Sequence, residues 1–111
     1  MTSENLKRIA ADSNALLSAV SGGAARKVFL NAEIEVVTTH FNIDEVLEYI
    51  PHMALKYHVE KESLFLQLKM LPLEIVDETE YKQEMASATQ FLENKDPDDV
   101  PLLALALQQK I

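Results

Sequence analysis

Residues 96–107 read DPDDVPLLALAL, a cluster of acids followed by an almost wholly apolar helix. Carboxylates suit the start of a helix, because the first turn has free N–H groups and the positive end of the helix dipole. Pro101 also fits there, since the first turn does not need its missing N–H. A helix that is apolar on every side is expected to be buried on every side. The stretch therefore predicts a buried last helix whose start brings carboxylates to the edge of the interior.

Composition limits the class of protein. The 111 residues predict a single domain, 1–111, and the 48% hydrophobic content is that of a globular protein. The absence of cysteine leaves carboxylate or imidazole chemistry for any metal site. No apolar stretch has the length of a signal peptide or a membrane span, so a cytoplasmic location without a membrane partner is expected. A net charge of −8 argues against nucleic-acid binding by bulk attraction, although bound divalent cations lower the local charge of an acidic nuclease centre.

Strands and helices are predicted to alternate along the chain. Apolar and β-branched runs predict strands at 9–11, 34–39 and 73–76. Helical spacing and capping residues predict helices from about Asn14 to Val20, then at 24–30, 43–57, 61–71 and 77–92, and finally from Asp98. The paired glycines after Val20 should interrupt the first helical segment. Pro51 should kink the third helix, and Asn94 can end the fifth helix. This alternation indicates an α/β fold with a parallel sheet.

Three carboxylates come from separate segments that should share one end of the sheet. Asp12 follows the first strand, Glu45 is expected in the first turn of the helix after the second strand, and Asp99 opens the last helix. Such oxygen donors suit Mg²⁺ or Mn²⁺. Three carboxylates about 5 Å apart would repel by roughly 3 kcal/mol per pair at an effective dielectric near 20, so cations or protons must neutralise them. The alternative is that these acids are helix caps and solvated surface residues.

Three segments together resemble the PIN domain, a family of metal-dependent ribonucleases that includes VapC-type toxins of toxin–antitoxin systems. The segments are Asp12-Ser13-Asn14 after a short apolar strand, FNIDEVLEYI at 41–50, and DPDDVPLLALA at 96–106. The likeness runs from about residue 7 to residue 111. It implies a three-layer α/β sandwich around a short parallel sheet with strand order 3-2-1-4-5.

The resemblance also implies site residues and partners. Asp12, Glu45 and Asp99 would be the catalytic metal ligands, with Asn14 as a supporting residue, while Asp96 and Asp98 would be flanking caps. Mg²⁺ or Mn²⁺ would be the cofactor and RNA the substrate. An antitoxin and a second copy of the chain would be protein partners.

Members of the family usually continue into a fourth strand and a further acid. Residues 1–111 hold neither, so the C-terminal strands are expected to be missing, strand 9–11 to form an edge, and RNA cleavage to be weak or absent. One alternative is a non-catalytic PIN-like remnant that acts as a protein-interaction module. A second is a phosphoryl-transfer domain that uses Asp12, although Asn14 stands where a phosphatase motif needs an acid. His40 is a further candidate near the site.

Overall fold

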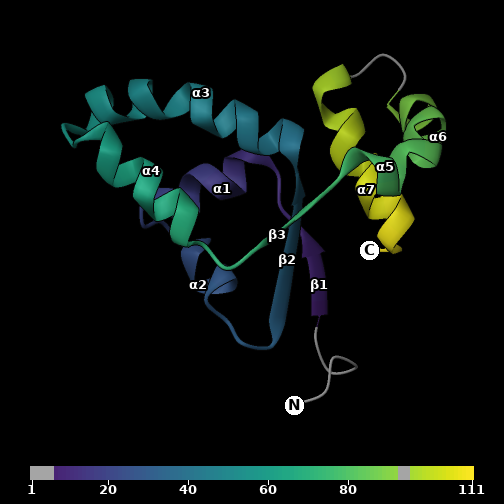
Figure 1. Ribbon diagram of the computed structural model, residues 1–111, viewed down its shortest axis with the longest axis horizontal. Helices are drawn as coiled ribbons and strands as arrows, with labels where there is room; N and C mark the ends of the chain where they lie inside the picture. Colours follow the sequence, from purple (N-terminus) through teal and green to yellow (C-terminus); the bar gives the residue numbers. More distant parts are fainter. Residues whose placement is uncertain (1–6, 93–95) are drawn as a thin grey trace.

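A parallel three-stranded sheet lies at the centre of the computed structural model, which describes residues 7–92 and 96–111 (Figure 1). Its strands are β1 (Lys7–Ala10), β2 (Ile34–Thr39) and β3 (Glu74–Val76), and β2 lies between the other two. Ile9 pairs with Val36 and Thr38 pairs with Ile75. The α/β class and the order 3-2-1 are therefore confirmed, and β1 forms an edge of the sheet in the part of the chain described.

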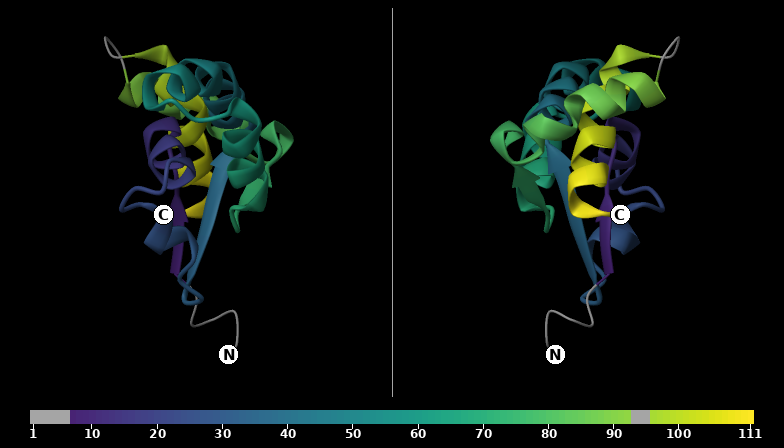
Figure 2. Two further views of the ribbon diagram at one scale, coloured as in Figure 1. Left: turned by 90° about the vertical axis from the view of Figure 1, so that its left-hand side faces the viewer. Right: turned by 90° about the vertical axis from the view of Figure 1, so that its right-hand side faces the viewer.

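Helices cover both faces of the sheet (Figures 1 and 2). On one side lie α1 (Ser13–Val20), α2 (Arg26–Phe29), α3 (His40–Tyr57) and α4 (Lys61–Met70). On the other side lie α5 (Glu78–Tyr81), the 3₁₀ turn η2 (Lys82–Glu84), α6 (Met85–Phe91), the 3₁₀ turn η3 (Pro97–Asp99) and α7 (Val100–Gln109). This confirms the three-layer arrangement. None of the described helices is long and apolar enough to cross a membrane.

Each face of the sheet has its own apolar core, because neighbouring side chains on a strand point to opposite faces. Val36 packs with Leu16 and Ile50 under α1 and α3. Val37, the next residue on β2, packs with Leu105 of α7 on the other face. All five side chains are buried. Burial of both faces is what a parallel sheet requires, and it fixes β2 as the central strand.

The last helix is less buried than its sequence predicts. Val100, Ala104 and Leu105 are buried, whereas Leu102 and Leu103 are half-buried. The prediction of burial on every side is wrong, because α7 packs against the sheet on one side and against α5 and α6 on another, and the rest of its surface faces solvent. Its apolar sequence therefore exceeds what the described core requires.

The helix predicted at 77–92 is broken into α5, η2 and α6. Both helical pieces pack against α7, and the turn between them lets Tyr81 and Ala88 enter the same apolar core. Tertiary packing here outweighs local helix propensity. Asn94, predicted as the end of this helix, lies outside the described residues. In the third helix, by contrast, α3 runs across Pro51 without a break and starts earlier than predicted, at His40.

The break predicted at the paired glycines is confirmed. Gly22 has φ +84°, a left-handed conformation that favours glycine. A Cβ at Gly23 would lie 2.6 Å from Ser18 Oγ and 3.0 Å from the Ser18 carbonyl oxygen. The first position thus needs a special backbone conformation and the second needs the absence of a side chain, and together they end α1 and redirect the chain into α2.

Candidate functional site

The first two strands end side by side and turn directly into helices. Thr38 Oγ1 donates a 2.8 Å hydrogen bond to the Ala11 carbonyl, which ties the ends of β1 and β2 together. Asp12 then caps α1, and its Oδ1 accepts from the Ala15 N–H at 2.8 Å. Thr39 caps α3, and its Oγ1 accepts from the Asn42 N–H at 3.1 Å. The N-termini of two helices therefore lie together at the carboxyl ends of β1 and β2.

Because Thr39 caps α3 without an intervening loop, Glu45 lies in the second helical turn. The prediction of a first-turn position is wrong for this reason. Asn42 and Glu45 are three residues apart, so their side chains share one face of the helix. That face meets the start of α1, where Ser13 contacts both residues.

A relay of hydrogen bonds positions the Glu45 carboxylate. Thr39 Oγ1 donates to Asn42 Oδ1 at 2.6 Å, Asn42 Nδ2 donates to Ser13 Oγ at 3.0 Å, and Ser13 Oγ donates to Glu45 Oε1 at 2.6 Å. Thr39 and Asn42 are buried, at 0% and 4% exposure. A hydrogen bond to a charged group is stronger than one between neutral groups. The Thr39–Asn42–Ser13 relay therefore holds one oxygen of Glu45 in place from within the core.

No role of this kind was predicted for Ser13, Thr39 or Asn42, although the sequence holds one signal for Asn42. Asn42, Val46 and Ile50 recur every four residues, which places Asn42 on the buried face of α3. A buried amide needs hydrogen-bond partners. Its partner on α1 lies 29 residues away in the chain, and only the tertiary structure identifies it.

A small cavity of about 170 Å³ lies where these helices meet the segment before α7. We call it the acidic cavity, because five carboxylates line it together with Ser13, Asn14 and Asn42. The five are Asp12, Glu45, Asp96, Asp98 and Asp99. The structure thus brings Asp12, Glu45, Asp99 and Asn14, the residues chosen from the sequence, to a single cavity.

The carboxylates of the cavity differ in burial and in hydrogen bonding. Glu45 is half-buried, whereas Asp12 and Asp99 are exposed. Asp96 is a cap as expected, since its Oδ1 accepts from the Asp98 N–H at 2.9 Å. The prediction of Asp98 as a cap is wrong, because it lies within η3. Both Asp96 and Asp98 line the cavity.

The donor set fits a hard divalent cation. Carboxylate, amide and hydroxyl oxygens are the ligands that suit Mg²⁺ and Mn²⁺. Within residues 7–92 and 96–111, no three His, Asp or Glu side chains are grouped closely enough to hold one metal ion between them. Mg²⁺ usually keeps several waters and is held by one or two protein carboxylates. The cavity therefore fits a hydrated cation bound by one or two of its carboxylates.

His40 lies next to Thr39 of the relay but does not line the acidic cavity. It follows Thr39 on α3 and borders a neighbouring cavity of about 300 Å³. We call this the aromatic cavity; it is lined by His40, Phe41, Asp77, Glu78, Tyr81 and Pro101. Hydrogen bonds from Thr79, with a smaller contribution from His40, hold the pKa of Asp77 below its usual value. Burial raises the pKa of the Tyr81 phenol.

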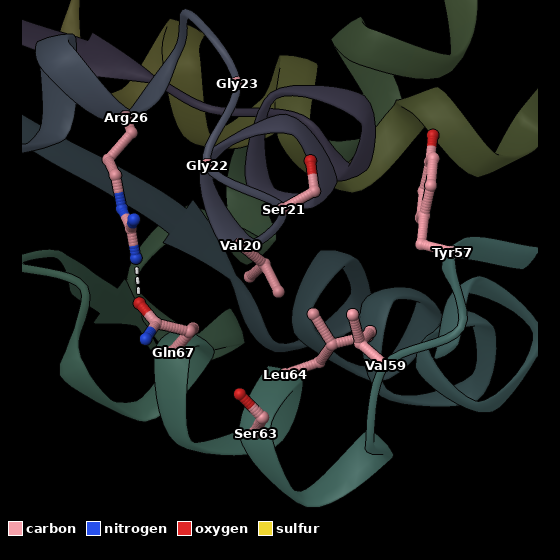
Figure 3. Close-up of a pocket in the computed structure, with 10 residues that line it drawn as sticks. All are labelled: Val20, Ser21, Gly22, Gly23, Arg26, Tyr57, Val59, Ser63, Leu64 and Gln67. Atoms are coloured by element: carbon pink, nitrogen blue, oxygen red, sulfur yellow. Dashed lines mark hydrogen bonds between the residues drawn. The ribbon is translucent and has the colours of Figure 1, made fainter. Parts of the chain in front are cut away.

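A third cavity, of about 490 Å³, lies at the opposite end of α1 (Figure 3). We call it the glycine-turn cavity, because the turn at Gly22 and Gly23 forms one wall, and residues of α2, α4 and the end of α3 form the others. Arg26 donates a hydrogen bond to Gln67 across it. No acid is among its described lining residues. It shares neither charge nor donor set with the acidic cavity.

Comparison with known proteins agrees with this architecture. A family model described as PIN domain matches residues 11–110, a stretch that contains Asp12, Glu45 and Asp99. A search of curated proteins found no match. The family match covers most of the chain and confirms the resemblance seen in its sequence. The chain therefore belongs to the PIN-domain family, a nuclease-type family whose members generally use divalent metals.

Proposed function

We propose that the chain is a Mg²⁺- or Mn²⁺-dependent endoribonuclease of the PIN type, with Asp12, Glu45 and Asp99 as its catalytic residues. One or two of these carboxylates bind the hydrated cation directly, and the others act through its bound waters. One observation carries the proposal: three segments far apart in the sequence line one acidic cavity at the carboxyl ends of the strands. Open α/β sheets generally bind ligands at this edge. The substrate is single-stranded RNA, and the reaction is hydrolysis of a phosphodiester.

The protein's own residues bind and orient. Asp12 and Asp99, both exposed, reach a cation from two helix starts, and Asn14 supports the site from the first turn of α1. Ser13 holds Oε1 of Glu45, which leaves Oε2 as the oxygen for a ligand. A divalent cation, when bound, lowers the pKa of a coordinated water and offsets the charge of the phosphate. In a chain of net charge −8, this neutralisation also lets RNA approach.

Asp96 and Asp98 alter the expectation of weak activity that the sequence gives. That expectation rests on the fourth acid that members of the family usually carry beyond the last helix. These two aspartates add carboxylates to the cavity of Asp12, Glu45 and Asp99. We therefore assign the role of the fourth acid to this pair and expect the chain itself to cleave RNA.

The test is cleavage of end-labelled single-stranded RNA by the full chain with Mg²⁺ or Mn²⁺. We expect internal cuts that a chelator abolishes, and loss of cleavage by about 100-fold or more in Asp12→Asn and in Asp99→Asn, because positioned catalytic groups carry effects of this size. Asp44→Asn is the matched control: Asp44 is an exposed acid next to Glu45 that does not line the cavity. Cleavage that survives Asp12→Asn unchanged would exclude the proposed centre.

A second candidate function is a non-catalytic PIN-like module that binds a protein. Large apolar side chains are exposed along α3 and α4: Leu55 at 79%, Met70 at 68%, Tyr57 at 55% and Leu66 at 54%. Exposed apolar residues that form a patch mark interaction surfaces. This candidate predicts no RNA cleavage with either metal.

We also propose that the nuclease acts as the toxin of a toxin–antitoxin system, a role that needs a protein partner. The exposed residues of α3 and α4 offer a surface to an antitoxin or to a second copy of the chain. Light scattering at micromolar concentration shows whether the isolated chain is a monomer or a homo-oligomer. We expect a homo-oligomer, and a monodisperse monomer would remove that part of the proposal.

A further inference from the structure

The aromatic cavity and the acidic cavity both lie at the carboxyl ends of the strands. His40 directly follows the last residue of β2, and Asp77 directly follows the last residue of β3. Asp12 follows the end of β1 by two residues. Because the strands are parallel and β2 is central, the acidic cavity lies beyond β1 and β2, and the aromatic cavity beyond β2 and β3. Figure 1 shows α3 and α5 leaving the sheet at these strand ends.

Two segments line both cavities. On α3, Phe41 borders the aromatic cavity and its neighbour Asn42 borders the acidic one. Before α7, Asp99 borders the acidic cavity, and Pro101, two residues later, borders the aromatic one. The two cavities are therefore bordered by consecutive residues on α3 and by residues two apart at the start of α7, so RNA held at the acidic cavity has a second cavity beside it.

Phe41 has no part in the described apolar cores. It is half-buried, yet it belongs to neither of the two core clusters that flank the sheet. Phe41 lines the aromatic cavity together with the exposed His40 and the buried Tyr81 of α5. Aromatic rings are the surfaces on which unpaired RNA bases stack. The fold thus gathers aromatic residues at a cavity next to the proposed catalytic centre.

The polar side of the cavity consists of hydrogen-bond acceptors. Asp77 Oδ1 accepts from the backbone N–H and the hydroxyl of Thr79, each at 2.9 Å, so Oδ2 is the oxygen available to a ligand. These bonds lower the pKa of Asp77 and keep it ionised at neutral pH. Glu78 adds a second, exposed carboxylate. Ionised carboxylates only accept hydrogen bonds, so they select a base with N–H groups on its edge.

We infer that the aromatic cavity binds one unpaired RNA base beside the scissile phosphodiester, with Phe41 and His40 as the stacking surface and the carboxylates of Asp77 and Glu78 as acceptors. The inference rests on the proposed ribonuclease function. Guanine fits best, because its N1–H and N2–H are adjacent donors that one carboxylate can accept together. Uracil fits worst, since its Watson–Crick edge offers one N–H between two carbonyls.

The first experiment measures base binding without cleavage. Guanosine and uridine, which carry no phosphate, are titrated into the full ¹⁵N-labelled chain. We expect guanosine to shift the amide signals of His40, Phe41 and Glu78 and to bind roughly 10-fold more tightly than uridine. Equal binding of the two nucleosides, no binding of either, or shifts confined to the glycine-turn cavity would overturn the inference.

Matched variants separate stacking from folding. Phe41→Leu keeps an apolar side chain but removes the ring, and we expect it to weaken guanosine binding roughly 10-fold, in line with the loss of one stacked base. Phe91→Ala, which removes an exposed ring on α6 outside the cavity, should leave binding unchanged. Glu78→Gln should lower the preference for guanosine, whereas Glu80→Gln on the same helix should not. Equal effects of the cavity and control variants would refute the assignment.

The second experiment separates this inference from the proposed function. Oligouridine carrying a single guanosine is cut by the full chain with Mn²⁺, and we expect cuts to cluster next to the guanosine in wild type and to spread in Phe41→Leu. Cleavage that depends on Asp12 but ignores the guanosine would overturn the base-binding inference and leave the nuclease. Guanosine binding without any cleavage would overturn the nuclease and leave the base-binding cavity.

Discussion

The acidic cavity and the glycine-turn cavity lie at opposite ends of α1. The glycine-turn cavity is nearly three times as large, about 490 Å³ against about 170 Å³. One cation, Arg26, and no described acid line it, and its guanidinium is already bonded to Gln67. Five carboxylates line the acidic cavity. By volume, the glycine-turn cavity would be the default binding site. By charge and donor set, the acidic cavity is the one suited to the proposed metal-dependent reaction.

The difference shows what marks the proposed catalytic site. Ser21, Gly22 and Gly23 form the turn that borders the glycine-turn cavity, and a cavity beside such a turn needs no functional explanation. Carboxylates that share a small cavity repel one another, and an unneutralised group of them costs stability. The buried relay that ends at Glu45 adds order to a place that the fold alone does not require. The gathering of carboxylates is therefore a better indicator of the proposed site than the volume of a cavity.

Among the tests that compare the two cavities, removal of the last link of the relay should give the largest effect. In Ser13→Ala, Glu45 loses its 2.6 Å hydrogen bond, and we expect RNA cleavage to fall by about 10- to 100-fold, as for other residues that orient metal ligands. The measurement is the single-turnover rate with saturating Mn²⁺. Ser63→Ala removes a hydroxyl from the glycine-turn cavity and is the control. If both serine variants lose activity equally, the two cavities do not differ in the way described.

Divalent cations should stabilise the protein through the acidic cavity. Binding to the folded chain alone, with free Mn²⁺ at 100 times its Kd, contributes about 2.7 kcal/mol. We expect Mn²⁺ to raise Tm in the wild type and in Asp44→Asn, and to raise it much less in Asp12→Asn. The measurement is a thermal melt followed by circular dichroism. The same rise in Asp12→Asn would place the cation elsewhere on the molecule.

Changes in the glycine-turn cavity should affect stability alone. Arg26→Ala removes the hydrogen bond to Gln67 between α2 and α4, and we expect a loss of about 0.5–1.5 kcal/mol in the free energy of unfolding. Urea unfolding measures it. RNA cleavage per folded molecule should equal that of the wild type. A loss of cleavage in this variant would give the larger cavity a part in the reaction and end the contrast.

Local signals in the sequence carry most of the fold and the positions of the acids. The β-branched run at 34–39 coincides with β2, the helix start after the first strand places Asp12, and the start of the last helix places Asp99. These are short-range patterns, set by residues within a turn or two of each other. This is why the family resemblance and the three-layer arrangement could be predicted.

Features that depend on distant contacts could not be predicted. Ser13 and Glu45 are 32 residues apart, so their hydrogen bond needs the crossing of α1 and α3. The break between α5 and α6 follows from burial of Tyr81 and Ala88 against α7. The outer face of α7 looked buried because apolar residues surround the helix, yet the described chain covers only part of it.

Thr39 is the last residue of β2, the cap of α3 and the first member of the relay. Its side chain is fully buried, and its hydroxyl bonds both the backbone and the side chain of Asn42. Local opening of this junction therefore disrupts the central strand, the longest helix and the orientation of Glu45 in a single event. As a result, a substitution that loosens the α3 side of the acidic cavity also destabilises the folded protein.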